Sequence, residues 1–96
     1  MIKVLIERDL PASFDVTDDR QAARHARIAL DAIIATQGKM HWLSTYATDD
    51  RKLFRLVVVE NEQVIEDYVR NAGIGGNIKI HRILRTLDPS LAAPGV

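Results

Sequence analysis

Four side chains that could do chemistry together stand in the four strand-like runs of this chain: Glu7, Tyr46, Arg55 and His81. In one interpretation they converge on a pocket, where histidine serves as acid or base and arginine binds an anion. In the other, Arg55 and Glu7 form a buried ion pair at an interface and His81 faces solvent. Both stay open, because a one-residue shift of a strand moves its side chains to the opposite face.

The sequence pattern predicts no metal site. The three histidines, His25, His41 and His81, have neither i, i+4 spacing on a helix nor alternate spacing on a strand. The acidic pairs at 18–19 and 49–50 are explained as residues of a helix start and a turn, although surface carboxylates can hold a divalent cation weakly.

Composition excludes several classes of function. The 96 residues include 13 basic and 13 acidic side chains, so no global field attracts nucleic acid or anionic lipid. The run 52–59 lacks the glycine and aromatics of an RNA-recognition strand. No stretch reaches the ~20 apolar residues of a membrane span, and the first apolar run is too short for a signal peptide. The absence of cysteine suits a reducing compartment, so we expect a cytoplasmic domain. From the charge balance and the lack of a membrane span we expect that it binds neither nucleic acid nor membrane.

The order of periodic segments predicts the fold. Strand-like runs alternate with two helical runs as strand-helix-strand, twice, which is typical of an α+β ferredoxin-like βαββαβ domain. We expect a four-stranded antiparallel sheet with both helices on one face, spanning residues 1–89, and a flexible tail at 90–96. The expected segments are the strands 2–10, 40–47, 52–59 and 77–87 and the helices 18–37 and 62–72.

The second helix carries clear end signals. Asn61 is a typical N-cap residue, and Gly73 stands where a left-handed C′ residue ends a helix. Ile74 then takes the place of the hydrophobic C″ partner in a Schellman ending.

Two helices on one face leave the other sheet face uncovered. An apolar patch of that size is unusual on a monomer, so we predict a homodimer whose sheets face each other, a dimeric α/β barrel. In the second strand, either the set Trp42, Ser44 and Tyr46 or the alternate set His41, Leu43 and Thr45 belongs to this face, and we favour the aromatic set. The other residues predicted there are Lys3, Leu5, Glu7, Leu53, Arg55, Val57, Val59, Lys79, His81, Ile83 and Arg85.

Three short stretches carry a resemblance to a known family. They are 5–11 (LIERDLP), 42–50 (WLSTYATDD) and 72–74 (AGI), followed by a last strand that ends in Asp88-Pro89. Together they are similar to a family of small bacterial proteins of unknown function whose best-described member binds nickel, and the resemblance covers Met1 to about Ser90. It implies a ferredoxin-like dimer and binding of nickel or another divalent cation, with no established reaction.

This chain also departs from the family pattern. Arg55 stands where many members have a cysteine, Val58 where many have an acidic residue, and Ser44 where some have histidine. The resemblance therefore assigns no metal ligand here.

Three functions remain open from the sequence. The first is a small homodimeric binding protein, with a divalent metal as the leading ligand. The second is a cofactor-free enzyme of monooxygenase, isomerase or dehydratase type, with a pocket on the inner sheet face. There His81 and Tyr46 would transfer protons and Arg55 would bind an anionic substrate. The third is a structural or regulatory dimer.

Overall fold

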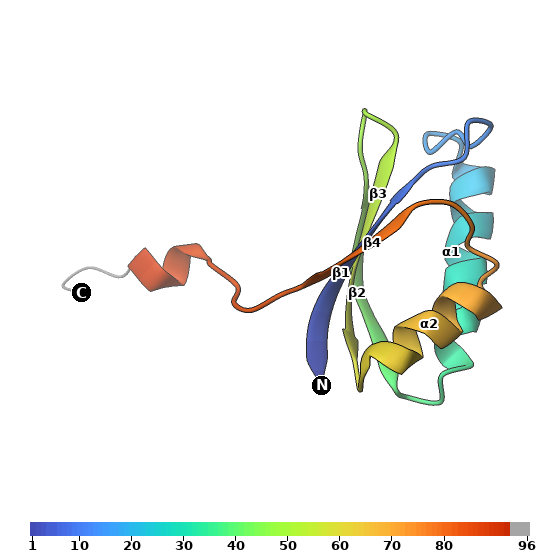
Figure 1. Cartoon of the computed structure of the whole chain (residues 1–96). Helices are drawn as coiled ribbons and strands as arrows, with labels where there is room; N and C mark the ends of the chain where they lie inside the picture. The colour runs from blue at the N-terminus through green and yellow to red at the C-terminus, as the bar shows by residue number, and fades with distance from the viewer. Residues whose placement is uncertain (93–96) are drawn as a thin grey trace.

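A computed structural model describes residues 1–92 and shows four antiparallel strands covered on one face by two helices (Figure 1). The strand order is β2-β3-β1-β4, which confirms the α+β ferredoxin-like βαββαβ fold. No helix in the described part of the chain is long and apolar enough to cross a membrane. The elements are β1 (Ile2–Asp9), α1 (Asp19–Ile34), β2 (Met40–Ala47), β3 (Lys52–Val59), α2 (Glu62–Asn71), β4 (Ile78–Arg82) and a 3-10 turn (Pro89–Ala92).

The first helix, α1, begins at Asp19, one residue later than the start expected at 18. Asp18 is its N-cap residue, because its carboxylate accepts hydrogen bonds from the backbone N–H groups of Arg20 and Gln21.

The second helix, α2, ends as its sequence predicted. Gly73 has a φ of 66°, in the left-handed region, and its N–H donates to the carbonyl of Arg70 at 3.2 Å. The N–H of Ile74 donates to the carbonyl of Val69 at 3.1 Å, which completes the Schellman motif. The motif turns the chain back, so that Ile74 packs against the core beneath the helices.

The core lies between the sheet and the two helices. Alternate residues of β1 and β3 supply its floor, and the inner faces of α1 and α2 supply its roof. Its buried members are Val4, Ile6, Ala32, Ile33, Met40, Val57, Val59, Val64, Ile65 and Tyr68.

The predicted orientation of β3 is wrong. Arg55 is paired with Ile6, and both point under the helices rather than to the uncovered side. The physical reason is that β3 is apolar on both faces, so its sequence shows no alternation that would fix the orientation. The other β3 residues expected on the uncovered face, Leu53, Val57 and Val59, are likewise buried under the helices.

A β-bulge decides the orientation of β2. The register shifts between Trp42 and Ser44, so neither of the two sets predicted from alternation survives intact. Trp42 and Thr45 face the helices, whereas Ser44 and Tyr46 face away from them.

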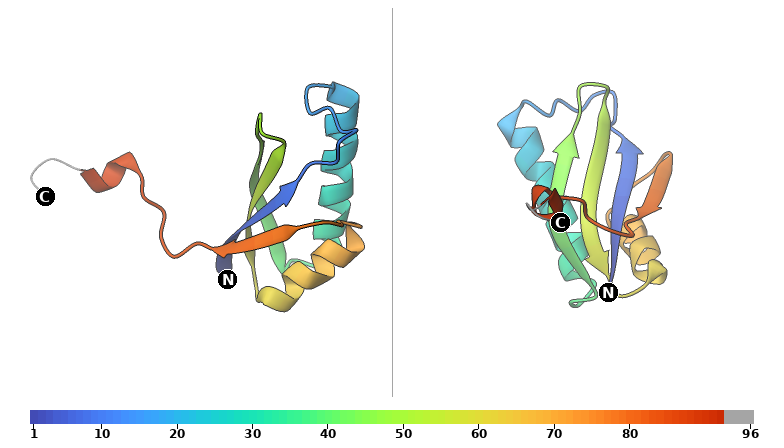
Figure 2. Two further views of the ribbon diagram at one scale, coloured as in Figure 1. Left: turned by 45° about the horizontal axis from the view of Figure 1, so that its top comes forward. Right: turned by 90° about the vertical axis from the view of Figure 1, so that its left-hand side faces the viewer.

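The side of the sheet away from the helices is hereafter the uncovered face. Figure 2 shows it turned toward the viewer in its right-hand view. Its residues, read from the strand register, are Lys3, Leu5 and Glu7 of β1; His41, Ser44 and Tyr46 of β2; Phe54, Leu56 and Val58 of β3; and Lys79 and His81 of β4.

The last strand is shorter than predicted. It ends at Arg82, and the following residues leave the sheet on the side of the uncovered face (Figures 1 and 2). Of the tail expected at 90–96, residues 90–92 belong to the 3-10 turn Pro89–Ala92, and 93–96 lie outside the described residues.

Candidate functional site: an arginine-lined cavity beneath the helices

The four site residues predicted from the sequence do not form one pocket. Glu7 and His81 do meet on the uncovered face, where Oε1 of Glu7 and Nε2 of His81 lie 3.0 Å apart. Tyr46 shares that face, but β3 lies between its strand and β1, and the side chain is 60% exposed. Arg55 points to the opposite side of the sheet and is 2% exposed.

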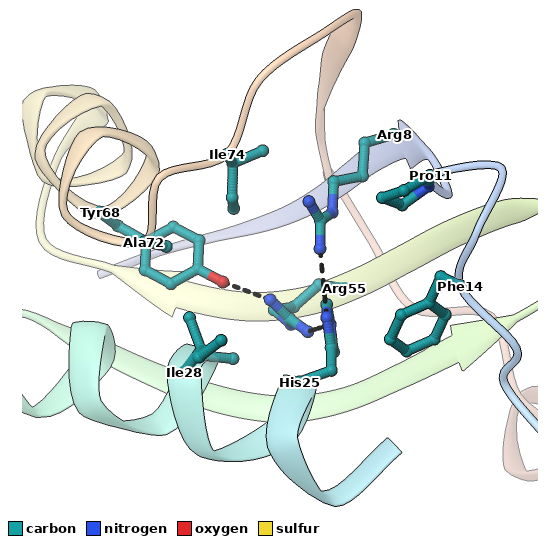
Figure 3. A pocket seen from close by; sticks show the side chains of 10 residues that line it. Arg8, Pro11, Phe14, His25, Ile28, Arg55, Tyr68, Ala72 and Ile74 are labelled. Carbon is teal, nitrogen blue, oxygen red and sulfur yellow. Dashed lines mark hydrogen bonds between the residues drawn. The ribbon is translucent and has the colours of Figure 1, made fainter. Parts of the chain in front are cut away.

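Arg55 instead lies at a cavity between the sheet and the helices, with a volume of about 180 Å³ (Figure 3). The cavity has an arginine-rich floor and largely apolar walls. Its lining residues are Arg8, Pro11, Phe14, His25, Ile28, Ala29, Arg55, Tyr68, Ala72 and Ile74.

The buried guanidinium of Arg55 forms hydrogen bonds with neutral groups and lies against an aromatic ring. Its Nε donates to Oγ1 of Thr45 at 3.0 Å, and one terminal nitrogen donates to the hydroxyl of Tyr68. The other terminal nitrogen lies 2.9 Å from Nε2 of His25, as Figure 3 shows. The face of Trp42 completes the surroundings, with its ring centre 5.1 Å from Cζ.

A second arginine reaches the same imidazole from the opposite side. One terminal nitrogen of Arg8 lies 3.4 Å from Nδ1 of His25. The Nε of Arg8 is buried and has no hydrogen-bond partner among the described residues. Unpartnered buried donors are rare in folded proteins, because each loses its hydration without compensation.

The cluster of Arg8, His25 and Arg55 has one hydrogen-bond acceptor too few for its donors. A guanidinium only donates, and a neutral imidazole has one acceptor nitrogen, yet both nitrogens of His25 face an arginine. We assign the acceptor to Nε2, which makes the shorter contact with Arg55, and the proton to Nδ1. The Nδ1–H of His25 and the guanidinium of Arg8 are then two donors that point at each other.

The cluster is also electrostatically unbalanced. Within residues 1–92, no carboxylate forms an ion pair with Arg8 or Arg55. Burial, followed by the positive charges of Arg55 and Arg8, lowers the pKa of His25 to about 4, so the ring is neutral at pH 7. Burial and the charge of Arg55 also lower the pKa of Arg8. The cavity therefore concentrates positive charge that an anion would neutralise.

The side chain of Arg51 holds the loop that carries Pro11 and Phe14, two residues of the cavity wall. The guanidinium of Arg51 donates to the carbonyls of Pro11 and Phe14, at 2.5 and 2.7 Å, and so fixes the loop between β1 and α1. Phe14 packs edge-on against His25, with ring centres 5.3 Å apart and an interplanar angle of 67°.

A second hollow adjoins the cavity on this side. It measures about 200 Å³ and shares Phe14, His25 and Ile28 with the cavity, to which it adds Gln21 and Arg24. The shared residues make the two hollows neighbours.

Sequence reasoning missed three members of the site, although each carried a signal. Arg8 continues the alternation of β1 after Ile6 and therefore belongs to the helix-covered face. His25 stands four residues before the buried Ala29, on the same helix face. Tyr68 stands four residues after Val64 on the buried face of α2, although this spacing gives no role to its hydroxyl.

No metal centre is evident in the described part of the chain. Within residues 1–92, no three His, Cys, Asp or Glu side chains gather closely enough to hold a metal ion. The cation binding implied by the family resemblance stays a prediction.

Comparison with known proteins supports the fold. The chain is similar to the crystal structure of SCO4226 from Streptomyces coelicolor A3(2), with a TM-score of 0.67 over 88% of this chain and 99% of that one. The sequence identity is 10%, so the likeness bears on the fold alone. No family model and no curated protein matches the chain.

Proposed function

We propose that this protein binds a small organic anion whose carboxylate accepts hydrogen bonds from Arg8 and His25 at the cavity floor. One observation carries the proposal: two donors, the Arg8 guanidinium and the Nδ1–H of His25, converge at a cavity without an acceptor. A carboxylate supplies up to four lone-pair positions in the planar geometry that a guanidinium fork matches. Its charge also offsets that of the two arginines.

The walls favour a carboxylate with an apolar body. Pro11, Phe14, Ile28 and Ile74 surround the polar floor and offer no hydrogen bonds to a second charged group. A free phosphate would need donors on several sides, whereas a carboxylate presents its charge at one end only. We therefore infer that the anionic end contacts the floor and the apolar end contacts the walls.

The size of the cavity limits the ligand. Drug-sized ligands occupy roughly 300–1,000 Å³, and this cavity measures about 180 Å³. The ligand is accordingly a small acid, and the adjoining hollow of about 200 Å³ provides space for a short extension past Phe14.

The proposal is for binding in this cavity. The proton-transfer residues named from the sequence, His81 and Tyr46, lie on the uncovered face, away from the cavity. We keep the cytoplasm as the proposed location, since a chain without cysteine suits a reducing compartment.

Thermal unfolding with matched probes tests the proposal. We expect benzoate at 10 mM to raise the midpoint and benzamide, its neutral analogue, to leave it unchanged. With a Kd of about 1 mM the stabilisation is about 1.4 kcal/mol, or roughly 5–10 °C for a domain of this size. Inorganic phosphate is expected to give a smaller rise.

The variant Arg8→Met is expected to abolish the benzoate effect. Arg27→Met is the matched control, because Arg27 is an exposed arginine on α1 that pairs with Asp31. Equal shifts with benzamide and benzoate, or a full benzoate shift in Arg8→Met, would contradict the proposal.

A further inference from the structure

The last ten described residues, 83–92, form an extension that we call the C-terminal arm. It leaves β4 and projects from the side of the uncovered face, away from the helices (Figures 1 and 2). The radius of gyration is 15.0 Å and the longest dimension 50 Å, whereas a compact chain of this length has a radius of gyration of roughly 12.5 Å. The arm accounts for the elongation.

The arm has little to hold it within its own chain. Its last sheet-like contact is the N–H of Ile83, which donates to the carbonyl of Lys3 at 2.9 Å. Beyond that point Lys3 contacts Thr86, at 3.4 Å, and the remaining hydrogen bonds of the described arm are local ones around Asp88.

The arm nevertheless exposes large apolar side chains to water. Leu84 is 92% exposed and Leu87 is 79% exposed, and Leu91 is also exposed. Burying one such leucine is worth about 1.5–3 kcal/mol. A sequence with three leucines in an otherwise unsupported segment is typical of an arm that docks on another surface.

The uncovered face offers such a surface. It has a run of neighbouring apolar side chains on β3 and β1, with charged groups on β1 and β4 and polar groups on β2 beside it, as in an interface with an apolar core and a polar rim. The apolar members are Leu5, Phe54, Leu56 and Val58, and the charged members are Lys3, Glu7, Lys79 and His81 when protonated.

The area of the uncovered face indicates whether two facing sheets alone would form a stable interface. Three strands of eight residues and one of five, at about 3.3 Å per residue and about 4.8 Å apart, give roughly 460 Å² per copy, or about 900 Å² for two facing sheets. Stable interfaces bury about 1,600 ± 400 Å². Facing sheets therefore fall short, and two docked arms would bring the total to the usual range.

We propose that a second copy of this chain covers the uncovered face, sheet against sheet, and that the C-terminal arm of each copy crosses to the other. Facing sheets lie about 10 Å apart, and the six residues 83–88 before the 3-10 turn reach about 20 Å when extended, so the arm spans the gap with length to spare. A two-fold axis makes the exchange reciprocal, so each copy both gives and receives an arm. The inference does not depend on the anion cavity, which lies on the other side of the sheet.

The oligomeric state tests the pairing. Light scattering after size exclusion of the full chain at about 50 μM is expected to give a dimer. Phe54→Glu on the uncovered face and the double variant Leu84→Glu/Leu87→Glu in the arm are each expected to raise the dimer dissociation constant at least tenfold. Ile34→Glu is the control, because Ile34 is 61% exposed on α1, in the helix layer. A monomeric full chain, or arm variants that dimerise like the control, would overturn the proposal.

Filtered NMR on a mixture of labelled and unlabelled chains tests the exchange itself. We expect interchain NOEs between the methyl groups of Leu84 or Leu87 and the ring of Phe54. NOEs confined within one chain would show that each arm folds onto its own sheet, and would refute the exchange. Circular dichroism of every variant establishes that loss of pairing is not loss of folding.

Discussion

Nε2 of His25 lies 2.9 Å from a guanidinium nitrogen of Arg55, while Nδ1 of the same ring faces Arg8 at 3.4 Å. No protonation state of an imidazole lets both nitrogens accept, so the ring cannot satisfy both arginines. Because these groups adjoin a cavity, the missing acceptor has room to arrive from outside the chain. This relationship links the fold to the proposed binding of an anion.

The first prediction concerns pH. The pKa of His25 is lowered to about 4 in the folded protein, chiefly by burial and then by Arg55 and Arg8, against about 6.5 in the unfolded chain. The unfolded state therefore binds more protons between these values, and this contribution to stability is lost as the pH falls from 6.5 toward 4.

The variant His25→Gln keeps an acceptor for Arg55 but does not titrate. We expect urea unfolding of this variant to lose less stability between pH 7 and pH 4.5 than the native chain does. His41→Gln, at an exposed position of β2, is the control. Parallel pH profiles for the native chain and His25→Gln would disprove the assignment.

The second prediction concerns Arg55→Met. The guanidinium has no carboxylate partner among the described residues, so its removal also removes an uncompensated cost of burying charge. Against this, Tyr68, Thr45 and His25 each lose a hydrogen bond. We expect the free energy of unfolding to change by less than about 2 kcal/mol, while the benzoate effect disappears.

The buried Glu7–Arg55 pair expected from the sequence is not formed, because the two side chains lie on opposite faces of the sheet. Removing one partner of a buried ion pair costs about 3–5 kcal/mol. A loss of that size in urea unfolding of Arg55→Met would therefore contradict the second prediction.

The third prediction concerns Tyr68→Phe. Tyr68 is buried and its hydroxyl accepts from Arg55, so the variant leaves a charged donor unpartnered, at a cost of about 1–3 kcal/mol. Tyr46→Phe removes the same hydroxyl from an exposed ring and is expected to change stability by less than about 0.5 kcal/mol.

A double-mutant cycle identifies the source of the effect. In the Arg55→Met background, Tyr68→Phe is expected to cost much less, because the donor that needed the hydroxyl is gone. The same cost in both backgrounds would mean that the hydroxyl of Tyr68 acts independently of Arg55.

Local signals made part of the fold predictable. Asn61, Gly73 and Ile74 act through backbone hydrogen bonds within a few residues, so their types alone determined how α2 begins and ends. The order of the elements followed in the same way from the change between strand and helix periodicity.

The site was harder to predict because it depends on the orientation of two strands. The run around Arg55 is apolar on both faces and has no alternation, and the bulge between Trp42 and Ser44 changes the orientation of β2 within the strand. On α1, alanines on several faces blurred the buried stripe, so the position of His25 four residues before Ala29 was only a weak signal. The alternation of β1, in contrast, was enough to place Arg8 on the helix-covered face.

The most direct test follows the side-chain N–H groups of the arginines during a titration of the ¹⁵N-labelled full chain with benzoate. We predict a saturable shift of the Nε–H of Arg8, which has no hydrogen-bond partner within residues 1–92, together with a shift of the His25 ring. The Nε–H of exposed Arg27 is expected to stay in place. Benzoate that leaves Arg8 unmoved, or that shifts both arginines equally and without saturation, would contradict an anion site in this cavity.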